Sequence, residues 1–291
     1  MIPTKSREAT TIGEVLGAAW RLFLAGMATV FPWILAAELL ELLPVAGSGG
    51  SILDTDLGNF VQPGYLWHTL LVGVAQAFLY CIAILNLAKL AAEAPQGNPV
   101  WVALRGTPSL FIGYLLYELI VIFGLGLTVL VFVLALMALG LTPALVLCIV
   151  PLAPTAAAST ALALFAYPAV LEQRGPFAAL NESSRLARTA WGRVSLVMTI
   201  PALALLLVWF VDNGAQMTKD LGYIQNVMQH AQEAGSADEL QALGALQGMP
   251  PSHPGGFAFR LLGTVLGALA WWYTVTVCYT QYRDLKQSKR D

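Results

Sequence analysis

Glu118 is the residue of this sequence whose position most needs a chemical explanation. It is the only Asp, Glu, Lys or Arg between Arg105 and Glu172, and it lies within a long apolar stretch. An ionised carboxylate deep in hydrocarbon costs at least roughly 2.5 kcal/mol, so we expect Glu118 to be protonated or to face a polar partner. Tyr114, one helical turn earlier, is the partner expected on the same helix, and Gln76 is the one expected from a neighbouring helix. A structural hydrogen bond and a proton-coupled role are both open.

A second pair of carboxylates, Glu38 and Glu41, lies about one helical turn apart near the end of the first apolar stretch. Two carboxylates at this spacing could share a proton or bind a cation. The alternative is an interfacial pair solvated by water, and the position of the pair near the outer end of the stretch favours it.

Basic residues gather just past the middle of the chain. The segment LNESSRLARTAWGRV carries Arg185, Arg188 and Arg193, and Arg174 precedes it, so four of the fifteen basic residues fall within twenty positions. Bases next to a membrane mark its cytoplasmic side, and each gains about 1 kcal/mol near an anionic leaflet. The cluster is therefore either an orientation signal alone or also a binding site for anionic lipid headgroups.

Motifs of nucleophilic, metal or phosphoryl-transfer chemistry are absent from the sequence, which contains no GxSxG, HExxH, P-loop or paired-cysteine pattern. The three histidines have no ligand spacing, and the three cysteines (Cys81, Cys148 and Cys278) each lie in an apolar run, where they are expected to pack. We therefore expect no catalytic residues, no cofactor and no metal.

The composition indicates which elements must position these side chains. Apolar residues make up 57% of the 291 residues and charged residues only 11%, whereas soluble domains carry about 25% charged residues. Such a surface is expected to be solvated by lipid, and the net charge of −2 gives no reason to expect a nucleic-acid partner. We predict a single integral membrane domain over residues 1–291, an all-α polytopic bundle of about six spans.

Four spans are expected near residues 26–43, 67–88, 194–211 and 257–279, where apolar runs approach the roughly 20 residues that cross a bilayer. The first is expected to be retained rather than cleaved as a signal peptide. Residues 108–171 are long enough for two, three or four crossings. The basic segments on both sides require an even number, and two long helices fit best, with or without a half-inserted stretch around Pro143, Pro151 and Pro154.

The distribution of basic residues predicts the orientation. With both termini in the cytoplasm, thirteen of the fifteen Lys and Arg residues lie inside and two, Lys219 and Arg260, lie outside. This map places residues 212–256 outside the membrane as an outer loop, in which helical spacing of apolar residues allows two short helices. A loop without regular structure is the alternative.

Three cytoplasmic segments are expected to form short amphipathic helices at the membrane interface. Thr11 and Glu14 have capping-box spacing, Pro99 opens a stretch with Trp101 and Arg105, and Pro176 opens the segment that carries the arginine cluster. In that last segment, Phe177, Ala179, Leu180, Leu186, Ala187, Ala190 and Trp191 share an apolar half, and Asn181, Glu182, Arg185, Thr189 and Arg193 share a polar half.

The region around the arginine cluster resembles the YciC-like bacterial inner-membrane proteins and, more distantly, the membrane domain attached to some glycerophosphodiester phosphodiesterases. The resemblance is carried by Pro168, Val170, Ala179-Leu180, Ser184, Arg185-Leu186 and Trp191. It implies a six-span protein of the bacterial inner membrane, in a family without a settled activity. The chain departs from the family pattern at Pro154-Thr155, where related proteins usually carry Pro-Gly.

From these observations we expect a non-enzymatic membrane protein that binds membrane lipids, through their headgroups, or partner membrane proteins in the cell envelope. A transporter or channel for a small solute is the alternative, for which a polar path including Glu118 and Gln76 would be required. A lipid-modifying enzyme within the membrane is a third hypothesis, and the absence of catalytic motifs from the sequence disfavours it.

Overall fold

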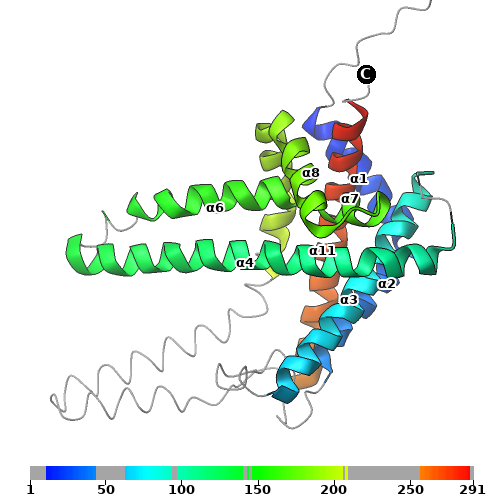
Figure 1. The fold of residues 1–291 in the computed structure, drawn as a ribbon, viewed down its shortest axis with the longest axis horizontal. Helices are drawn as coiled ribbons and strands as arrows, with labels where there is room; N and C mark the ends of the chain where they lie inside the picture. Colours follow the sequence, from blue (N-terminus) through cyan, green and yellow to red (C-terminus); the bar gives the residue numbers. More distant parts are fainter. Residues whose placement is uncertain are drawn as a thin grey trace, which may run out of the picture.

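The protein is helical throughout the residues that the structure describes (Figure 1). This computed structural model describes residues 11–43, 63–93, 97–139, 143, 146–205, 207–208 and 256–288. The helices are α1 (Ile12–Gly26), α2 (Phe31–Leu39), the 3-10 turn η1 (Leu40–Leu42), α3 (Pro63–Leu90), α4 (Pro99–Leu139), α6 (Ile149–Leu162), α7 (Ala166–Leu171), α8 (Pro176–Thr189) and α11 (Gly256–Gln287). A further apolar helix covers Trp191–Leu205. The predicted all-α fold class is confirmed.

Within the described residues, four helices are long and apolar enough to cross a membrane: Trp67–Leu90, Pro99–Ala135, Ile149–Leu171 and Leu261–Gln287. The α1–α2 pair passes the same test but is bent by 78°, so it is either a fifth, broken span or a re-entrant loop. Helix Trp191–Leu205 begins close to the predicted fifth span. The chain is thus a multi-pass membrane protein. Residues 212–255 of the predicted outer loop lie outside the described residues, and α11 starts at Gly256.

Helix α4 corrects one prediction. A separate interfacial helix was expected at Pro99 and a span from Pro108, but a single helix runs from Pro99 to Leu139 with Pro108 inside it. Asn98 starts this helix, because its Oδ1 accepts a hydrogen bond from the N–H of Val100 at 3.0 Å. Proline is tolerated inside membrane helices because neighbouring groups satisfy the freed backbone. Length and charge therefore located the span but not its first residue.

The long apolar region between the basic segments forms two antiparallel helical segments, α4 and α6–α7. Helices α4 and α6 lie side by side and extend away from the other described helices (Figure 1). Gly124 of α4 packs so closely on Thr155 of α6 that an added Cβ would lie 2.8 Å from the Thr155 Cβ. Thr155, Ser159 and Ala163 recur at four-residue spacing in the sequence, as do Gly263 and Gly267, and small residues at this spacing predict close approach between membrane helices. The same prediction for Gly267 of α11 is not borne out among the described residues, since a Cβ there would meet none of them within 4 Å.

The N-terminal helix begins as its sequence predicts. The Thr11 hydroxyl accepts a hydrogen bond from the Glu14 N–H at 3.3 Å, and the Glu14 carboxylate accepts one from the Thr11 N–H at 2.7 Å. Both bonds of the capping box are therefore present. One face of α1 is buried against α11 at Val15 and Ala19.

The break between α1 and α2 exposes backbone carbonyls, and side chains from two other helices bind them. The indole N–H of Trp272 on α11 donates to the Phe23 carbonyl at 3.1 Å. The Asn86 amide on α3 donates to the Thr29 carbonyl at 3.5 Å. In a membrane a broken helix is tolerated where neighbours satisfy its free groups, so the bend depends on α3 and α11.

One side-chain hydroxyl binds two backbone groups at the break between α6 and α7. Ser183 of α8 donates to the Ala161 carbonyl at 2.8 Å and accepts from the Leu164 N–H at 3.1 Å. Ser183 is fully buried. The short helix α7 therefore keeps its position because α8 packs over the point where the chain leaves α6.

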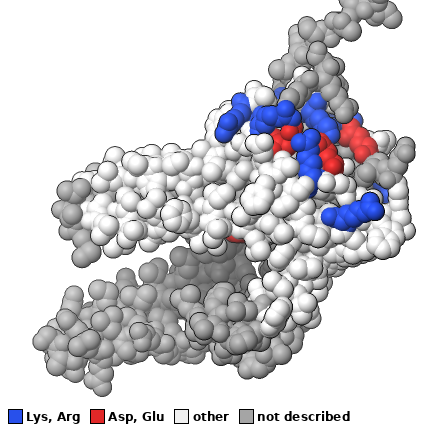
Figure 2. Space-filling view, in the orientation of Figure 1, with Lys and Arg blue, Asp and Glu red and all other residues white. Residues whose placement is uncertain are grey.

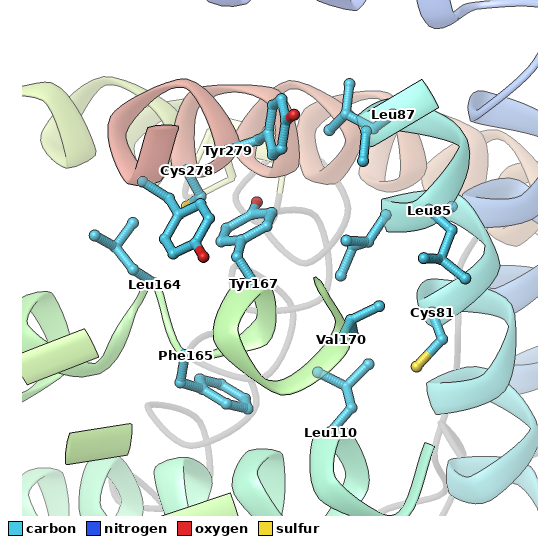
Figure 3. Close-up of a cluster of buried hydrophobic side chains, with 14 of the residues drawn as sticks. Cys81, Leu85, Leu87, Leu110, Leu164, Phe165, Tyr167, Val170, Cys278 and Tyr279 are labelled. Atoms are coloured by element: carbon cyan, nitrogen blue, oxygen red, sulfur yellow. The ribbon is translucent and has the colours of Figure 1, made fainter. Parts of the chain in front are cut away.

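Helix α7 lies at the centre of the apolar core. Figure 3 shows Tyr167 and Val170 of α7 between side chains of α3 and α4 and those of α11. The Tyr167 hydroxyl donates to the Val275 carbonyl of α11 at 2.6 Å. Cys81 and Cys278 are free thiols buried in this core, which agrees with the packing role expected for them.

Candidate functional site at the charged end of the bundle

Charged side chains of the described residues gather at one end of the molecule, near the C-terminus of α11 (Figure 2). Three ion pairs join helix ends there: Arg283–Glu93 at 2.7 Å, Lys286–Glu172 at 2.5 Å and Arg193–Asp284 at 2.6 Å. These pairs bring together the segments after α3, after α7 and after α8 around the last turns of α11. All of these segments were predicted to share one side of the membrane, and we call this surface the charged end.

Glu172, at the C-terminus of α7, binds three side chains of the charged end. Its carboxylate accepts hydrogen bonds from the Lys286 ammonium and the Tyr282 hydroxyl, each at 2.5 Å, and from the Arg174 Nε at 2.6 Å. Partial burial alone would raise the pKa of Glu172, but the hydrogen bonds from Lys286 and Tyr282 and the nearby positive charges outweigh it and lower the pKa. Glu172 is therefore held as an anion that fastens α7 to α11.

The turn after α7 positions Arg174. Gln173 has a φ of 53°, in the left-handed region, where a non-glycine residue needs compensating contacts. Its amide donates to the Val170 carbonyl at 2.7 Å and to the Val102 carbonyl at 3.2 Å. The Ser109 hydroxyl of α4 binds the Arg174 carbonyl. These bonds reverse the chain so that α8 starts at Pro176, as predicted.

The faces of α8 correct the predicted amphipathic pattern in two places. Phe177 was assigned to the apolar half but is 72% exposed, and Glu182 was assigned to the polar half but is only 8% exposed. Glu182 turns inward because Arg174 at 3.3 Å and Arg185 at 2.5 Å neutralise it there. The buried face, which also contains Ser183, packs on α6 and α7, so α8 is a packed part of the bundle.

The four arginines of the predicted lipid site have different surroundings. Arg174 contacts Glu172 and Glu182, and Arg185 contacts Glu182. Arg193 pairs with Asp284 of α11, with only 18% of its side chain exposed. Arg188, in the last turn of α8, is exposed and forms no ion pair with a described residue. The structure thus brings Arg174 and Arg185 together on Glu182, whereas Arg193 pairs with a carboxylate of α11.

The acidic partners of these arginines were missed from sequence. Glu182 lies three residues before Arg185, a helical spacing that could have identified their pair. Glu172 and Lys286 are separated by 114 residues, and Asp284 and Arg193 belong to different helices. No local pattern reveals those two contacts, because they depend on where α11 packs.

The polar residues within the membrane are placed apart from one another. Gln76 of α3 donates to the Ala37 carbonyl of α2 at 3.1 Å, and the Glu38 carboxylate of α2 accepts a hydrogen bond from Tyr80 of α3. Glu118 is half-buried in α4 and takes part in none of the hydrogen bonds or ion pairs found among the described residues. Tyr114 is 45% exposed. The expected pairing of Glu118 with Gln76 is therefore not formed, and the Glu41 side chain lies outside the described part.

Among the described residues, no group of three or more His, Cys, Asp or Glu side chains is arranged to hold a metal ion. No family model, curated protein or solved structure matches the chain.

Proposed function

We propose that the protein is a non-enzymatic multi-pass protein of the bacterial inner membrane that binds anionic phospholipid headgroups at its charged end. The supporting observation is the excess of positive charge where α3, α7, α8 and α11 meet. Among the described residues, six basic side chains gather there with four acidic ones: Arg174, Arg185, Arg188, Arg193, Arg283 and Lys286 with Glu93, Glu172, Glu182 and Asp284. Two positive charges are left over at the boundary of an apolar protein. Such charges attract anionic lipid.

A binding role fits this site better than a catalytic one. Each of its four carboxylates forms an ion pair with an arginine or a lysine. Those of Glu93 and Glu172 also accept a hydrogen bond from a tyrosine hydroxyl. A general base needs an unoccupied lone pair directed at its substrate. The resemblance to the YciC-like proteins supports the same proposal, because that family is known by its membrane location and not by a reaction.

The proposed lipid binding predicts selective co-purification. The parent protein, extracted in a mild detergent, should carry phosphatidylglycerol and cardiolipin at a higher proportion than the host membrane, measured by native mass spectrometry and lipid extraction. Raising the salt concentration should reduce this enrichment, since exposed charges are screened within about 10 Å at 0.1 M salt. Bound lipid of the same composition as the host membrane would refute the proposal.

The proposed orientation predicts that the charged end faces the cytoplasm. A cysteine at Ser288, beside the last turn of α11, should be protected from a membrane-impermeant maleimide in intact spheroplasts. A cysteine at Ser236, in the predicted outer loop, should react. Labelling of Ser288→Cys before the membrane is permeabilised would reverse the orientation, and the parent with its three native cysteines gives the background.

A further inference from the structure

The outward face of α8 carries an exposed apolar side chain and positively charged side chains along the same side of the helix. Phe177, Asn181, Arg185 and Arg188 are all exposed, and their spacings of four, four and three residues place them on one side of a helix. At 1.5 Å rise per residue, Phe177 and Arg188 are about 16 Å apart along the axis. The face therefore presents an aromatic ring near one end and two guanidinium groups near the other.

The two guanidinium groups of this face have hydrogen-bonding capacity to spare. Arg185 contacts Glu182 through one terminal nitrogen only, and the planar guanidinium carries five N–H donors on three nitrogens. Arg188 forms no ion pair with a described residue and lies one turn from Arg185. Arginines at this spacing repel each other unless an anion lies between them. An anion held by both would remove that repulsion.

Arg174 and Arg193 differ from this pair because they already serve the fold. Arg174 bridges Glu172 and Glu182 at 2.6 Å and 3.3 Å. Arg193 has its counter-ion on α11, at 2.6 Å. Arg174 uses two of its three guanidinium nitrogens in these contacts, and only 18% of the Arg193 side chain is exposed, so both present fewer accessible donors than Arg185 and Arg188. The four basic residues that gather in the sequence thus separate into two that hold helices together and two that face outward.

We infer that the outward face of α8 binds one anionic phospholipid, with Arg185 and Arg188 holding the phosphate, Asn181 bonding polar headgroup oxygens and Phe177 contacting the apolar part. Guanidinium groups bind phosphate through paired N–H donors, and an exposed aromatic ring beside them adds apolar contact. A lipid supplies both the anion and the apolar surface, whereas inorganic phosphate supplies the anion alone. This inference rests on the proposed function and assigns its ligand to particular residues.

Single substitutions test the assignment. Arg185→Gln and Arg188→Gln should each lower the retention of phosphatidylglycerol about five-fold in native mass spectrometry, the effect of one juxtamembrane base. Arg188→Lys should retain more lipid than Arg188→Gln because it keeps the charge. Arg193→Gln should lower the melting temperature, since it breaks the pair with Asp284, and should lower retention less than Arg188→Gln does.

The controls separate this inference from the proposed function. Arg21→Gln removes an exposed arginine of α1 and should leave retention at the parent level. If Arg21→Gln and Arg188→Gln lowered retention equally, the attraction would be diffuse and the α8 site would be wrong, although the proposed function would stand. If an excess of inorganic phosphate displaced the lipid completely, the contact with Phe177 would be contradicted. If the parent showed no enrichment of anionic lipid, the proposed function would fail together with the site.

Discussion

Gly26→Ala should destabilise the protein strongly, although it adds only one methyl group. Gly26 ends α1 and lies against the ring of Trp272, and an added Cβ would overlap that ring, with the Cη2 atom only 2.9 Å away. Trp272 is fully buried and donates its indole N–H to the Phe23 carbonyl at the α1–α2 break. Overpacking costs about 1–3 kcal/mol, and loss of this hydrogen bond would add about 1–3 kcal/mol. The apparent melting temperature in detergent, followed by fluorescence-detected size exclusion, should fall by several degrees.

Gly17→Ala is the matched control, because it makes the same change on the same helix where a Cβ would meet nothing within 4 Å among the described residues. It should be neutral or stabilise the helix by up to about 1 kcal/mol, since alanine favours helix over glycine. Combining Gly26→Ala with Trp272→Leu should cost less than the sum of the two single changes, because the second removes the ring that clashes. Strict additivity would mean that Trp272 is not the obstacle.

Ser183→Ala is the second substitution with a large expected effect. It removes the hydroxyl that binds the Ala161 carbonyl and the Leu164 N–H at the break between α6 and α7. Each buried backbone group left without a partner costs about 1–3 kcal/mol. The melting temperature should therefore fall, and limited proteolysis should cut more readily near residues 161–165 than in the parent.

Ser184→Ala provides the comparison one position along the same helix. Ser184 is half-buried and takes part in no hydrogen bond found among the described residues, so its loss should change the melting temperature little. Equal stability of the two variants would show that the break is satisfied without Ser183.

Features of the fold that depend on neighbouring residues were predictable. The capping box of Thr11 and Glu14 and the start of α8 at Pro176 follow from backbone groups a few residues apart. The long apolar helices follow from the scarcity of charge. Continuity of α4 through Pro108 was not predicted, because proline ends a helix in water, whereas inside this bundle the helix continues.

Features that depend on packing were not predictable from the chain. Glu182 reads as a solvent-facing residue, yet it is buried because two arginines reach it. Ser183 reads as an ordinary helix surface residue, yet it binds the backbone of a helix break about twenty residues earlier. The clustering of all four arginines of the predicted lipid site is visible in the sequence. Helical spacing could have paired Arg185 with Glu182, but no local pattern pairs Arg193 with Asp284, because these two residues lie on different helices.

The length of α4 has a consequence for the membrane around the protein. Its apolar part, Pro99–Ala135, has 37 residues and so extends about 55 Å, against a hydrocarbon thickness of about 30 Å. Only 11% of its most apolar stretch of 18 residues is buried within the protein. The helix runs across the direction of α11 (Figure 1). Such hydrophobic mismatch is relieved by tilting the helix or by locally thickening the bilayer. The α4–α6 hairpin should therefore lie strongly oblique in the membrane and give the protein a wide footprint among the lipids.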